Sequence, residues 1–348
     1  MKKTTPILPL FESFIKESES GQRRKKNGEK IKASTISTYK YVHNNLRLFC
    51  ATNNFNLRIC DARKLNAREF KSEKNYWKKF YVQFTNFLYK KGCHDNYVGH
   101  NIKHLRTFFN YLTNDKDFST GDFQKLFYVR KEQIPILVLN PEQLKFLIHD
   151  KNFHQRLNHN QKRIKEIFVF GCTTGLRFSD LFKLTNKEFE ILDGIHYVKI
   201  KSQKTKSYSY IRLPDYAVDI YKQHRKRSMK RPVFETISLL NFNKNLKKIG
   251  ELAGWTNTVF KARELLGKEI IQYKNGTKQE NRFCDLMSSH MMRRTAITTM
   301  LILGMPEHLV RNVSGHTDGS ASFYRYVHYA QSYIDQEIMK VHDILQQN

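Results

Sequence analysis

The stretch TTGLRFSDL, residues 173–181, determines our interpretation of the second half of this chain. Arg177 follows Gly175 and precedes Asp180, a pattern that predicts a position near the start of a helix. The free N–H groups at a helix start favour an anion, and an arginine adds a bidentate fork for phosphate oxygens. The alternative is a surface arginine that pairs with Asp180.

Further segments with cationic or phenolic side chains follow Arg177. They are QKTKS (203–207) with Lys204, SSHMMRR (288–294) with His290 and Arg293, VSGH (313–316) with His316, and FYRYVH (323–328) with Tyr324 and Tyr326. No segment is decisive alone, but their joint occurrence in this order, in the last half of a very basic chain, indicates one site. These are the groups that attack on a phosphodiester requires.

Helical spacing relates some of these residues to one another. His290 and Arg293 stand three apart and share a helix face, whereas Arg294 points to another face. Gly315 and His316 are predicted at a further helix start, where glycine allows close approach to a ligand. For His290, the alternative to phosphate binding is a core or pH-responsive histidine.

The net charge of the chain points to a polyanionic partner. Its 348 residues are enough for two domains, and 61 basic against 32 acidic residues give a charge of +29. Nucleic acid is the commonest polyanion, and an acidic membrane surface is the competing interpretation. The chain has no run of about 18 apolar residues, so we expect no membrane span.

We expect neither export nor a metal site nor a cofactor. The basic start of the chain precedes an apolar stretch that Pro6 and Pro9 interrupt, which argues against a signal peptide. The five cysteines are scattered without a C-x-x-C pair, as in a reduced, cytoplasmic protein. His154 and His159 lack further residues at ligand spacing, so we predict solvated surface there. The chain also lacks a G-x-x-x-x-G-K-[ST] loop and an acidic cluster for Mg²⁺.

Residues 1–125 are predicted to form a helical bundle. Apolar stripes recur at helical spacing from Ile36 to Phe49, from Tyr76 to Leu88 and from Val98 to Leu112, and Ser34 or Thr35 caps the first helix. The basic stretch 21–32 precedes these helices without apolar periodicity. It is either a solvated loop or a loop that contacts DNA phosphates through Arg23, Arg24, Lys25 and Lys26.

A linker over residues 126–136 leads to a second domain, residues 137–348. Asn140 caps a helix with Pro141 at its first position. From there the pattern is mainly helical, but residues 196–200 and 208–213 alternate apolar and polar side chains around QKTKS, which predicts a β-hairpin. We assign no function to residues 256–287, which are basic and longer than the pattern requires.

Taken in order, the motifs resemble those of the tyrosine recombinase (phage integrase) family: T-G-L-R, a lysine in a β-hairpin, H-x-x-R, G-H, and a tyrosine shortly after. The resemblance covers residues 137–330 at motif level. It implies a mainly α fold with a small β-hairpin or sheet, in which an N-terminal helical core-binding (SAM-like) bundle and an α+β catalytic domain form a C-shaped clamp on double-stranded DNA. It also implies the simple two-domain type, without an arm-binding domain.

The resemblance assigns catalytic roles to Arg177, Lys204, His290, Arg293, His316 and Tyr326. In the family, the arginines and histidines bind the scissile phosphate. His316 could instead help to accept the tyrosine proton. Lys204 would protonate the leaving 5′ oxygen, with Lys206 as the alternative. Lys206 and Arg294 are otherwise candidates for DNA contact.

The choice of nucleophile lies between two tyrosines. The family places its tyrosine about nine residues after the G-H histidine, whereas Tyr324 and Tyr326 stand eight and ten residues after His316. We favour Tyr326 because the following Tyr-Val-His resembles the usual continuation of the family motif. For Tyr324, the alternative is packing against Phe323.

The predicted function is site-specific DNA recombination through a 3′-phosphotyrosyl intermediate, without metal or ATP, for a mobile genetic element. The alternatives are a type IB topoisomerase-like enzyme and a catalytically silent DNA-binding regulator. At the C-terminus, Ile334, Ile338, Val341 and Leu345 form one apolar helix stripe. It either packs on its own domain or, as the family suggests, passes to a neighbouring protomer in a tetramer on paired sites.

Overall fold

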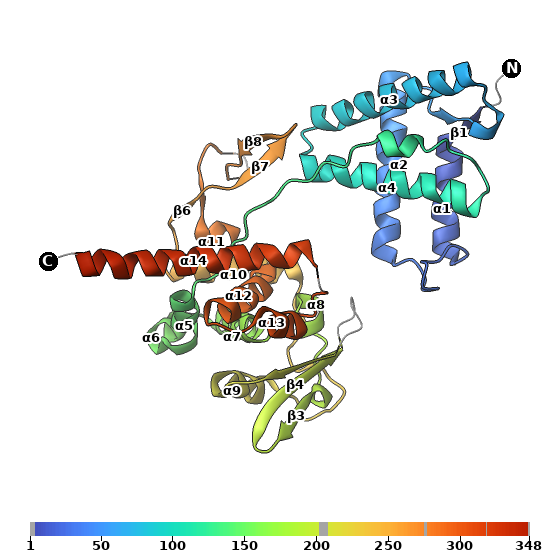
Figure 1. Cartoon of the computed structure of the whole chain (residues 1–348). Coiled ribbons are helices and arrows are strands. Elements are labelled where there is room, and N and C mark those ends of the chain that lie inside the picture. The colour runs from blue at the N-terminus through green and yellow to red at the C-terminus, as the bar shows by residue number, and fades with distance from the viewer. Residues whose placement is uncertain (1–3, 202–207, 275–276, 318, 347–348) are drawn as a thin grey trace. The chain divides into compact units, whose positions relative to one another are not determined.

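Figure 1 shows the computed structural model of the chain, which describes residues 4–201, 208–274, 277–317 and 319–346. The chain divides into two compact units: Met1–Ile134 with Lys261–Gln272, here the N-terminal unit, and Pro135–Phe260 with Tyr273–Asn348, here the C-terminal unit. Among the described residues, no helix has the length and apolar character needed to cross a membrane. The predicted mainly α fold with small sheets is confirmed.

Helices with an aromatic core build the N-terminal unit. Its elements are α1 (Ile7–Ser20), α2 (Ala33–Asn53), α3 (Ala67–Lys90), α4 (Asp95–Asp115), the 3-10 turns η1 (Ala62–Lys64) and η2 (Phe123–Leu126), and the short ladder of β1 (Thr5–Pro6) with β2 (Arg58–Ile59). Phe80 and Phe84 of α3 pack edge-on against Phe49 of α2, and all three are fully buried. The three predicted helices are confirmed as α2, α3 and α4, but the predicted cap is wrong, because Lys32 is the N-cap residue of α2 and Ser34 and Thr35 lie inside the helix.

The apolar pattern of the sequence does not predict helix α1. Pro6 is its N-cap residue and Pro9 lies in the first turn, where a missing N–H breaks no intrahelical hydrogen bond. The helix buries Phe11 and Phe14 completely in the aromatic core. Proline in this stretch therefore marks the start of a helix and does not interrupt it.

The first part of the predicted linker, residues 126–136, packs on the N-terminal unit. Phe127 is fully buried, with its ring centroid 6.0 Å from that of Phe80 and 5.5 Å from that of Phe109. The boundary between the units falls after Ile134. Burial of Phe127 explains why the ordered unit extends beyond the predicted end of the bundle at residue 125.

A hairpin of β7 (Ala262–Leu265) and β8 (Lys268–Ile271) completes the N-terminal unit, although its sequence lies far along the chain. The Arg263 guanidinium donates to Glu132 Oε1 from Nε at 3.0 Å and from Nη2 at 2.5 Å. The Glu264 N–H donates to Glu132 Oε2 at 2.7 Å. The Glu132 side chain is only 1% exposed, so the hairpin supplies the partners of a buried carboxylate.

A second buried carboxylate holds the tip of this hairpin. Asp95, at the start of α4, accepts hydrogen bonds from the N–H groups of Leu266 and Gly267 at 2.9 and 2.8 Å. Both tip residues have positive φ, 56° for Leu266 and 77° for Gly267, a conformation that is strained for leucine. The two hydrogen bonds to a charged acceptor offset that strain.

The C-terminal unit is mainly helical, with a three-stranded antiparallel sheet at one edge. Its helices are α5 (Pro141–His149), α6 (Lys151–Arg156), α7 (His159–Thr174), α8 (Phe178–Leu181), η3 (Asn186–Glu188), α9 (Asp215–His224), α10 (Leu239–Leu252), α11 (Phe283–Leu286), α12 (Ser289–Ile302), α13 (Glu307–Ser314) and α14 (Ala321–Gln346). Its strands are β3 (Phe189–Leu192), β4 (Ile195–Lys201), β5 (Tyr208–Arg212), β6 (Thr258–Val259) and β9 (Asn281–Arg282). Asn140 caps α5 through a capping box, as predicted.

The β-hairpin predicted around QKTKS is confirmed. Strand β4 pairs with β5 in an antiparallel register from Tyr197 opposite Arg212 to Lys201 opposite Tyr208, and β3 pairs with the other edge of β4. Lys204 and Lys206 lie outside the described residues.

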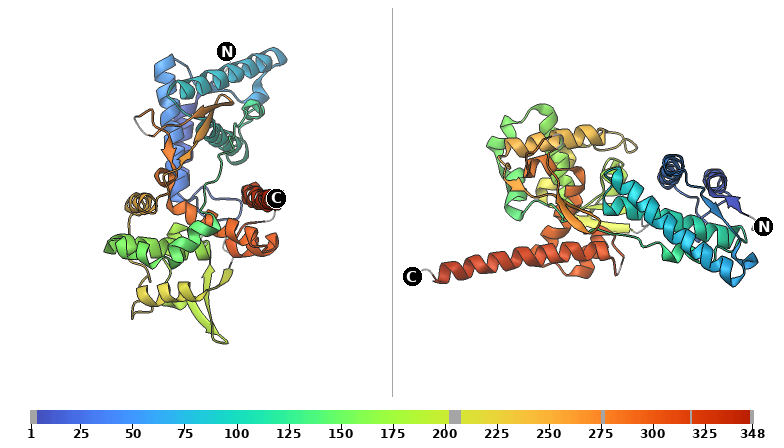
Figure 2. Two further views of the ribbon diagram at one scale, coloured as in Figure 1. Left: turned by 90° about the vertical axis from the view of Figure 1, so that its left-hand side faces the viewer. Right: turned by 90° about the horizontal axis from the view of Figure 1, so that it is seen from above.

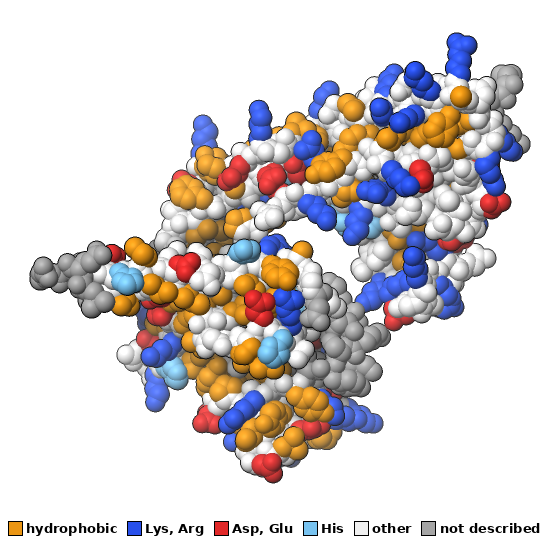
Figure 3. Space-filling model, in the orientation of Figure 1, with side chains coloured by type: hydrophobic (Ala, Val, Ile, Leu, Met, Phe, Trp, Pro, Cys, Tyr) orange, Lys and Arg blue, Asp and Glu red, His pale blue; other side chains and the backbone are white. Residues whose placement is uncertain are grey.

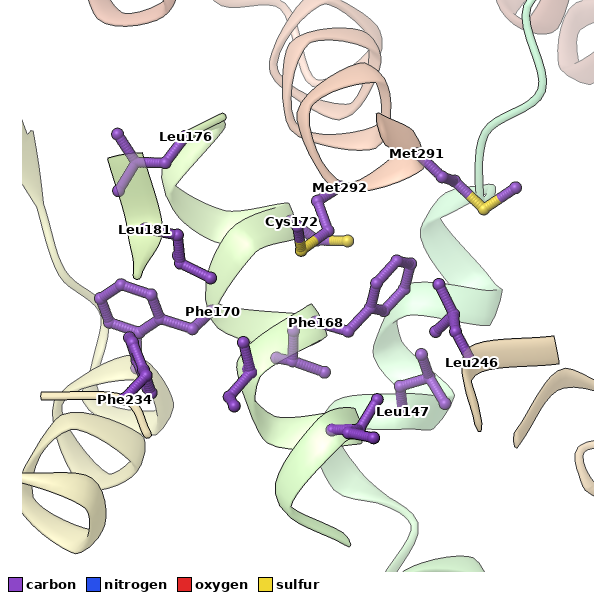
Figure 4. Close-up of a cluster of buried hydrophobic side chains, with 14 of the residues drawn as sticks. Leu147, Phe168, Phe170, Cys172, Leu176, Leu181, Phe234, Leu246, Met291 and Met292 are labelled. Carbon is purple, nitrogen blue, oxygen red and sulfur yellow. The ribbon is translucent and has the colours of Figure 1, made fainter. Parts of the chain in front are cut away.

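Helices α7 and α12 pack against each other within one apolar cluster. Figure 4 shows Phe168 and Cys172 of α7 and Met291 and Met292 of α12 in this cluster. At Gly171 of α7, an added Cβ would lie 2.3 Å from Met292 Sδ, so a larger residue would force Met292 or the helix to move. This close approach fixes the position of α12, which carries the H-x-x-R motif.

We predict that Arg263→Ala destabilises the N-terminal unit by about 3 kcal/mol, because it removes the cationic partner of a buried carboxylate. The free energy of unfolding can be followed by urea denaturation through the fluorescence of Trp77, which is fully buried in this unit, in a Trp255→Phe background. Arg63→Ala is the matched control, because Arg63 pairs with Asp61 at the surface with 52% of its side chain exposed. Equal midpoints for the two variants would show that the hairpin contributes nothing to this unit.

Candidate active site

Arg177 lies at a junction between two helices. Helix α7 ends at Thr174, Gly175 follows as its C-cap with φ 66°, and Arg177 is the N-cap residue of α8. The predicted position at a helix start is confirmed. Its Nη1 lies 3.9 Å from Asp180 Oδ2, so the ion pair of the alternative interpretation is also present, and it orients the guanidinium.

Arg293 joins the ends of two helices through its guanidinium. Its Nη1 donates to the Gly175 carbonyl at 2.9 Å, and its Nη2 donates to the Ser314 carbonyl. The residue is 6% exposed. Burial and, after it, the nearby charge of Arg177 lower the pKa of Arg293 to about 10, so the side chain stays protonated at neutral pH.

Gly315 and His316 follow the end of a helix, so the prediction that they lie at a helix start is wrong. Helix α13 ends at Ser314, and Gly315 is its C-cap with φ 61°, a conformation that glycine adopts without strain. The His316 N–H donates to the Arg311 carbonyl at 3.0 Å, and Ser314 Oγ lies 2.8 Å from His316 Nδ1. Because Gly315 has a left-handed backbone conformation, the chain turns and brings the imidazole of His316 near Tyr326. The centroids of the two rings lie 5.9 Å apart.

The two candidate tyrosines have different environments on α14. Tyr326 is 5% exposed and packs with Ile297, Val310 and Phe323. Tyr324 is 47% exposed, and the Arg311 guanidinium lies 5.1 Å from its ring centroid. Only Tyr326 is therefore placed with the H-x-x-R and G-H motifs.

Arg294 is closer to the site than its sequence position predicts. The prediction that it points to a different face from Arg293 does not separate it from the site, because its charge interacts with Tyr326. Burial lowers the pKa of the Arg294 guanidinium, and the interaction with Tyr326 opposes this larger effect by raising that pKa. Its Nε is buried and has no hydrogen-bond partner among the described residues. The signal in the sequence that points to Arg294 is the doubled arginine of SSHMMRR. The family resemblance assigns a catalytic role only to the first of these two arginines, Arg293.

His290 is surrounded by positive charge. Its pKa is lowered to about 4, first because the surrounding protein desolvates the ring, although the residue as a whole is exposed. The guanidinium groups that add to this effect belong to Arg294, Arg293, Arg177 and Arg325. The same electrostatic neighbourhood thus contains both H-x-x-R residues and the T-G-L-R arginine.

The family model described as the phage integrase family matches residues 138–332 of the chain. The chain belongs to the phage integrase family. The family resemblance of the sequence motifs is thereby confirmed.

Solved structures share the fold of this integrase-family chain. The Tn1549 transposon integrase in complex with a circular intermediate DNA is 14% identical, with a TM-score of 0.58 over 93% of this chain and 94% of that one. The XerH site-specific recombinase bound to a palindromic difH substrate is 15% identical, with a TM-score of 0.56 over 94% and 83%. A lambda integrase dimer bound to a COC' core site is 12% identical, with a TM-score of 0.54 over 93% and 95%. No curated protein matches the chain in sequence.

The basic stretch 21–32 of this integrase-family chain is a short, structured loop. Arg23 folds back onto the core: its guanidinium lies 4.4 Å from the Phe14 ring centroid and donates to Ser18 Oγ at 3.3 Å. This packing argues against Arg23 as a phosphate contact. Arg24 donates to the Gly28 carbonyl at 3.0 Å, Lys25 pairs with Glu29 at 2.7 Å, and Lys26 is exposed.

The depressed pKa of His290 predicts a pH-dependent stability. An unfolded histidine titrates near pH 6.5, so below that pH the unfolded state binds the proton more tightly than the folded state. This contribution is fully present above about pH 6.5 and is lost as the pH falls toward 4.

The test compares urea midpoints of the wild type and His290→Gln between pH 7.5 and pH 4.5. We expect the wild type to lose more stability than the variant over this range, because glutamine does not titrate. Parallel curves would contradict the assigned environment of His290.

Proposed function

We propose that this chain is a site-specific DNA recombinase that cuts and rejoins double-stranded DNA through a 3′-phosphotyrosyl intermediate. The observation that carries the proposal is the cluster around Tyr326. Segments that lie more than 140 residues apart in sequence, from Arg177 to Tyr326, bring guanidinium, imidazole and phenol groups into one electrostatic neighbourhood.

The cluster suits a phosphodiester whose phosphorus gains negative charge in the transition state. Arg177, His290, Arg293 and His316 are proposed to bind the non-bridging oxygens. Fixed donors stabilise such charge without solvent rearrangement, and loss of one typically costs about 10²–10³ in rate. The buried and unpartnered Nε of Arg294 fits the same function, because a bound anion would supply the missing acceptor.

The proposed reaction is a transesterification. Tyr326 loses its phenol proton to solvent water, and its Oη forms a bond to phosphorus as the bond from phosphorus to the 5′ oxygen breaks. The leaving 5′ oxygen takes a proton from Lys204, with Lys206 as the alternative. A 5′ hydroxyl of the same or a second duplex then attacks the phosphotyrosine and releases Tyr326. Because each step exchanges one phosphoester for another, we propose that no ATP is required. We also propose that the guanidinium, imidazole and lysine groups stabilise the charge that a metal ion would otherwise stabilise.

DNA is the proposed partner of both units. Figure 3 shows lysine and arginine side chains spread over the N-terminal unit, in keeping with the net charge of +29. Within the loop 21–32, Arg24, Lys25 and Lys26 remain candidates for phosphate contact. The three solved structures described above are DNA complexes, and one is a transposon integrase, which supports a role for this chain in a mobile element.

We predict that Tyr326→Phe abolishes the covalent protein–DNA adduct and retains DNA binding, because it removes only the nucleophilic oxygen. The measurement is a denaturing gel of protein incubated with nicked duplexes from the DNA that flanks the gene. Tyr324→Phe is the matched control and should form the adduct at close to the wild-type level. Loss of the adduct in Tyr324→Phe but not in Tyr326→Phe would show that Tyr324 is the nucleophile.

The same substrates separate recombination from topoisomerase activity. A recombinase exchanges strands only between paired specific sites. A type IB topoisomerase-like enzyme, in contrast, relaxes supercoiled plasmid DNA with little sequence specificity. A regulator without catalytic activity would bind these sites and form no adduct.

We further propose that the protein forms a tetramer on paired sites through the end of α14. Figures 1 and 2 show this end of α14 extending beyond the rest of the C-terminal unit. Ile338 and Val341 of the predicted stripe are 48% and 55% exposed, whereas Ile334 is partly buried. The exposed part of the stripe therefore lacks cover from its own unit.

Deletion of residues 335–348 is predicted to abolish tetramers on paired sites and to preserve binding to a single site. Sedimentation of the protein–DNA complexes measures both. The double variant Ile338→Ser with Val341→Ser should reproduce the deletion, while Lys340→Ala on the polar face should not. Unchanged assembly after the deletion would rule out the exchange of this helix.

A further inference from the structure

Two histidines on α4 of the N-terminal unit place the same ring atom side by side. His100 and His104 are the ends of HNIKH (100–104), and residues four apart are neighbours on one face of a helix. Their Nε2 atoms lie 3.2 Å apart, with ring centroids 4.4 Å apart and ring planes at 82°. His100 is exposed and His104 is partly exposed, so a small ion from solvent can reach the pair.

The separation of these two nitrogens matches that of two ligands on one metal ion. With Zn–N bonds of about 2.0–2.1 Å, two nitrogens lie about 3.3 Å apart in a tetrahedral site and about 2.9 Å apart at the right angle of an octahedral one. The observed 3.2 Å falls between these values. Chelation by the pair therefore requires no change in α4 and almost none in the nitrogen separation.

Both imidazoles are held in the neutral form that binds metal. The pKa of His104 is lowered to about 4, first because the surrounding protein desolvates the ring and then because of the charges of His100 and Lys103. Desolvation, followed by the charge of Lys103, also lowers the pKa of His100, although the residue as a whole is exposed. A metal ion binds the neutral imidazole, so at neutral pH it does not have to compete with imidazolium formation.

We propose that His100 and His104 together bind a divalent transition-metal ion such as Zn²⁺ through their Nε2 atoms. Imidazole nitrogen suits zinc, copper and nickel, whereas Mg²⁺ and Ca²⁺ prefer oxygen ligands. Among the residues that the structure describes, no group of three histidine, cysteine, aspartate or glutamate side chains could hold a metal, so water or an outside ligand takes the remaining positions. The site departs from the sequence-based expectation that the chain binds no metal.

Calorimetric titration of the full-length chain with ZnCl₂ tests the pair directly. We expect His100→Gln and His104→Gln each to weaken zinc binding by about 10²-fold, the lower end of the gain that two linked binding groups give over one. His159→Gln is the control, because His159 is an exposed histidine with no other histidine three or four residues away. It should bind zinc like the wild type. Wild-type affinity in both His100→Gln and His104→Gln would overturn the proposal.

Nuclear magnetic resonance of ¹⁵N-histidine identifies the nitrogens that bind. Without zinc, a hydrogen bond between the rings of His100 and His104, in which either ring can donate, keeps a hydrogen on one of the two Nε2 atoms. Zinc bound by both Nε2 atoms should remove that hydrogen and leave each ring protonated at Nδ1. The two Gln variants assign the signals. Zinc-induced shifts in neither ring, or in only one of them, would contradict chelation by the pair.

Zinc should also stabilise the N-terminal unit, because the two ligands are held together only while α4 is folded. The urea midpoint, followed through the buried Trp77 in the Trp255→Phe background, should rise with ZnCl₂ and return when EDTA is added. In His100→Gln the midpoint should not respond to zinc. An equal rise in this variant would place the ion at other residues and refute the site.

The proposed metal site goes beyond the proposed function, and the two can fail separately. No residue of the proposed active site takes part in it, so the adduct assay on nicked duplexes does not depend on zinc binding by His100 and His104. A wild type that binds zinc through this pair but forms no adduct would contradict recombinase activity alone. A wild type that forms the adduct but binds zinc no better than His100→Gln would contradict the metal site alone.

Discussion

The buried guanidinium of Arg293 is the constraint on which the site depends. Its hydrogen bonds to the carbonyls of Gly175 and Ser314 join the C-terminal ends of α7 and α13 across α12. Carbonyl oxygens solvate a cation without neutralising it, so Arg293 keeps its full charge inside the protein. Arg177 and His316 follow these two helix ends directly, which means that the same interaction also sets where they lie.

This arrangement gathers like charges where they oppose folding. Burial and the neighbouring guanidinium groups lower the pKa of both His290 and Arg293, which shows that the charged forms are disfavoured in the protein without a ligand. A bound phosphate would reverse the sign of that interaction. Donors fixed before the reaction also need little rearrangement during it. The like charges that are disfavoured in the protein without a ligand are thus the charges that the proposed reaction would use to bind a negatively charged phosphate.

Much of the fold follows from local rules in the sequence. Apolar stripes predict α2, α3 and α4, the Asn140-Pro141 pair predicts the start of α5, and alternation predicts the β4–β5 hairpin. Helix α1 escapes prediction because its two prolines sit at its start. The ion pair between Arg263 and Glu132 is not predicted either, because partners that lie 131 residues apart leave no local sequence pattern. For the same reason, the motifs indicate which residues form the site but not that Arg294 and Ser314 contact it.

The two candidate tyrosines differ in their tertiary environment, although their spacing from His316 does not separate them. Counted from His316, Tyr324 and Tyr326 are both one residue from the family interval, so linear distance favours neither. Both lie on α14, where successive residues are rotated by about 100°, and residues two apart therefore point about 200° apart. A helix can turn only one of them toward α12 and the other must face away. Burial of Phe323 and Tyr326 against Ile297 and Val310 fixes that rotation, and so the packing of a small apolar cluster brings the Tyr326 ring close to the His316 ring.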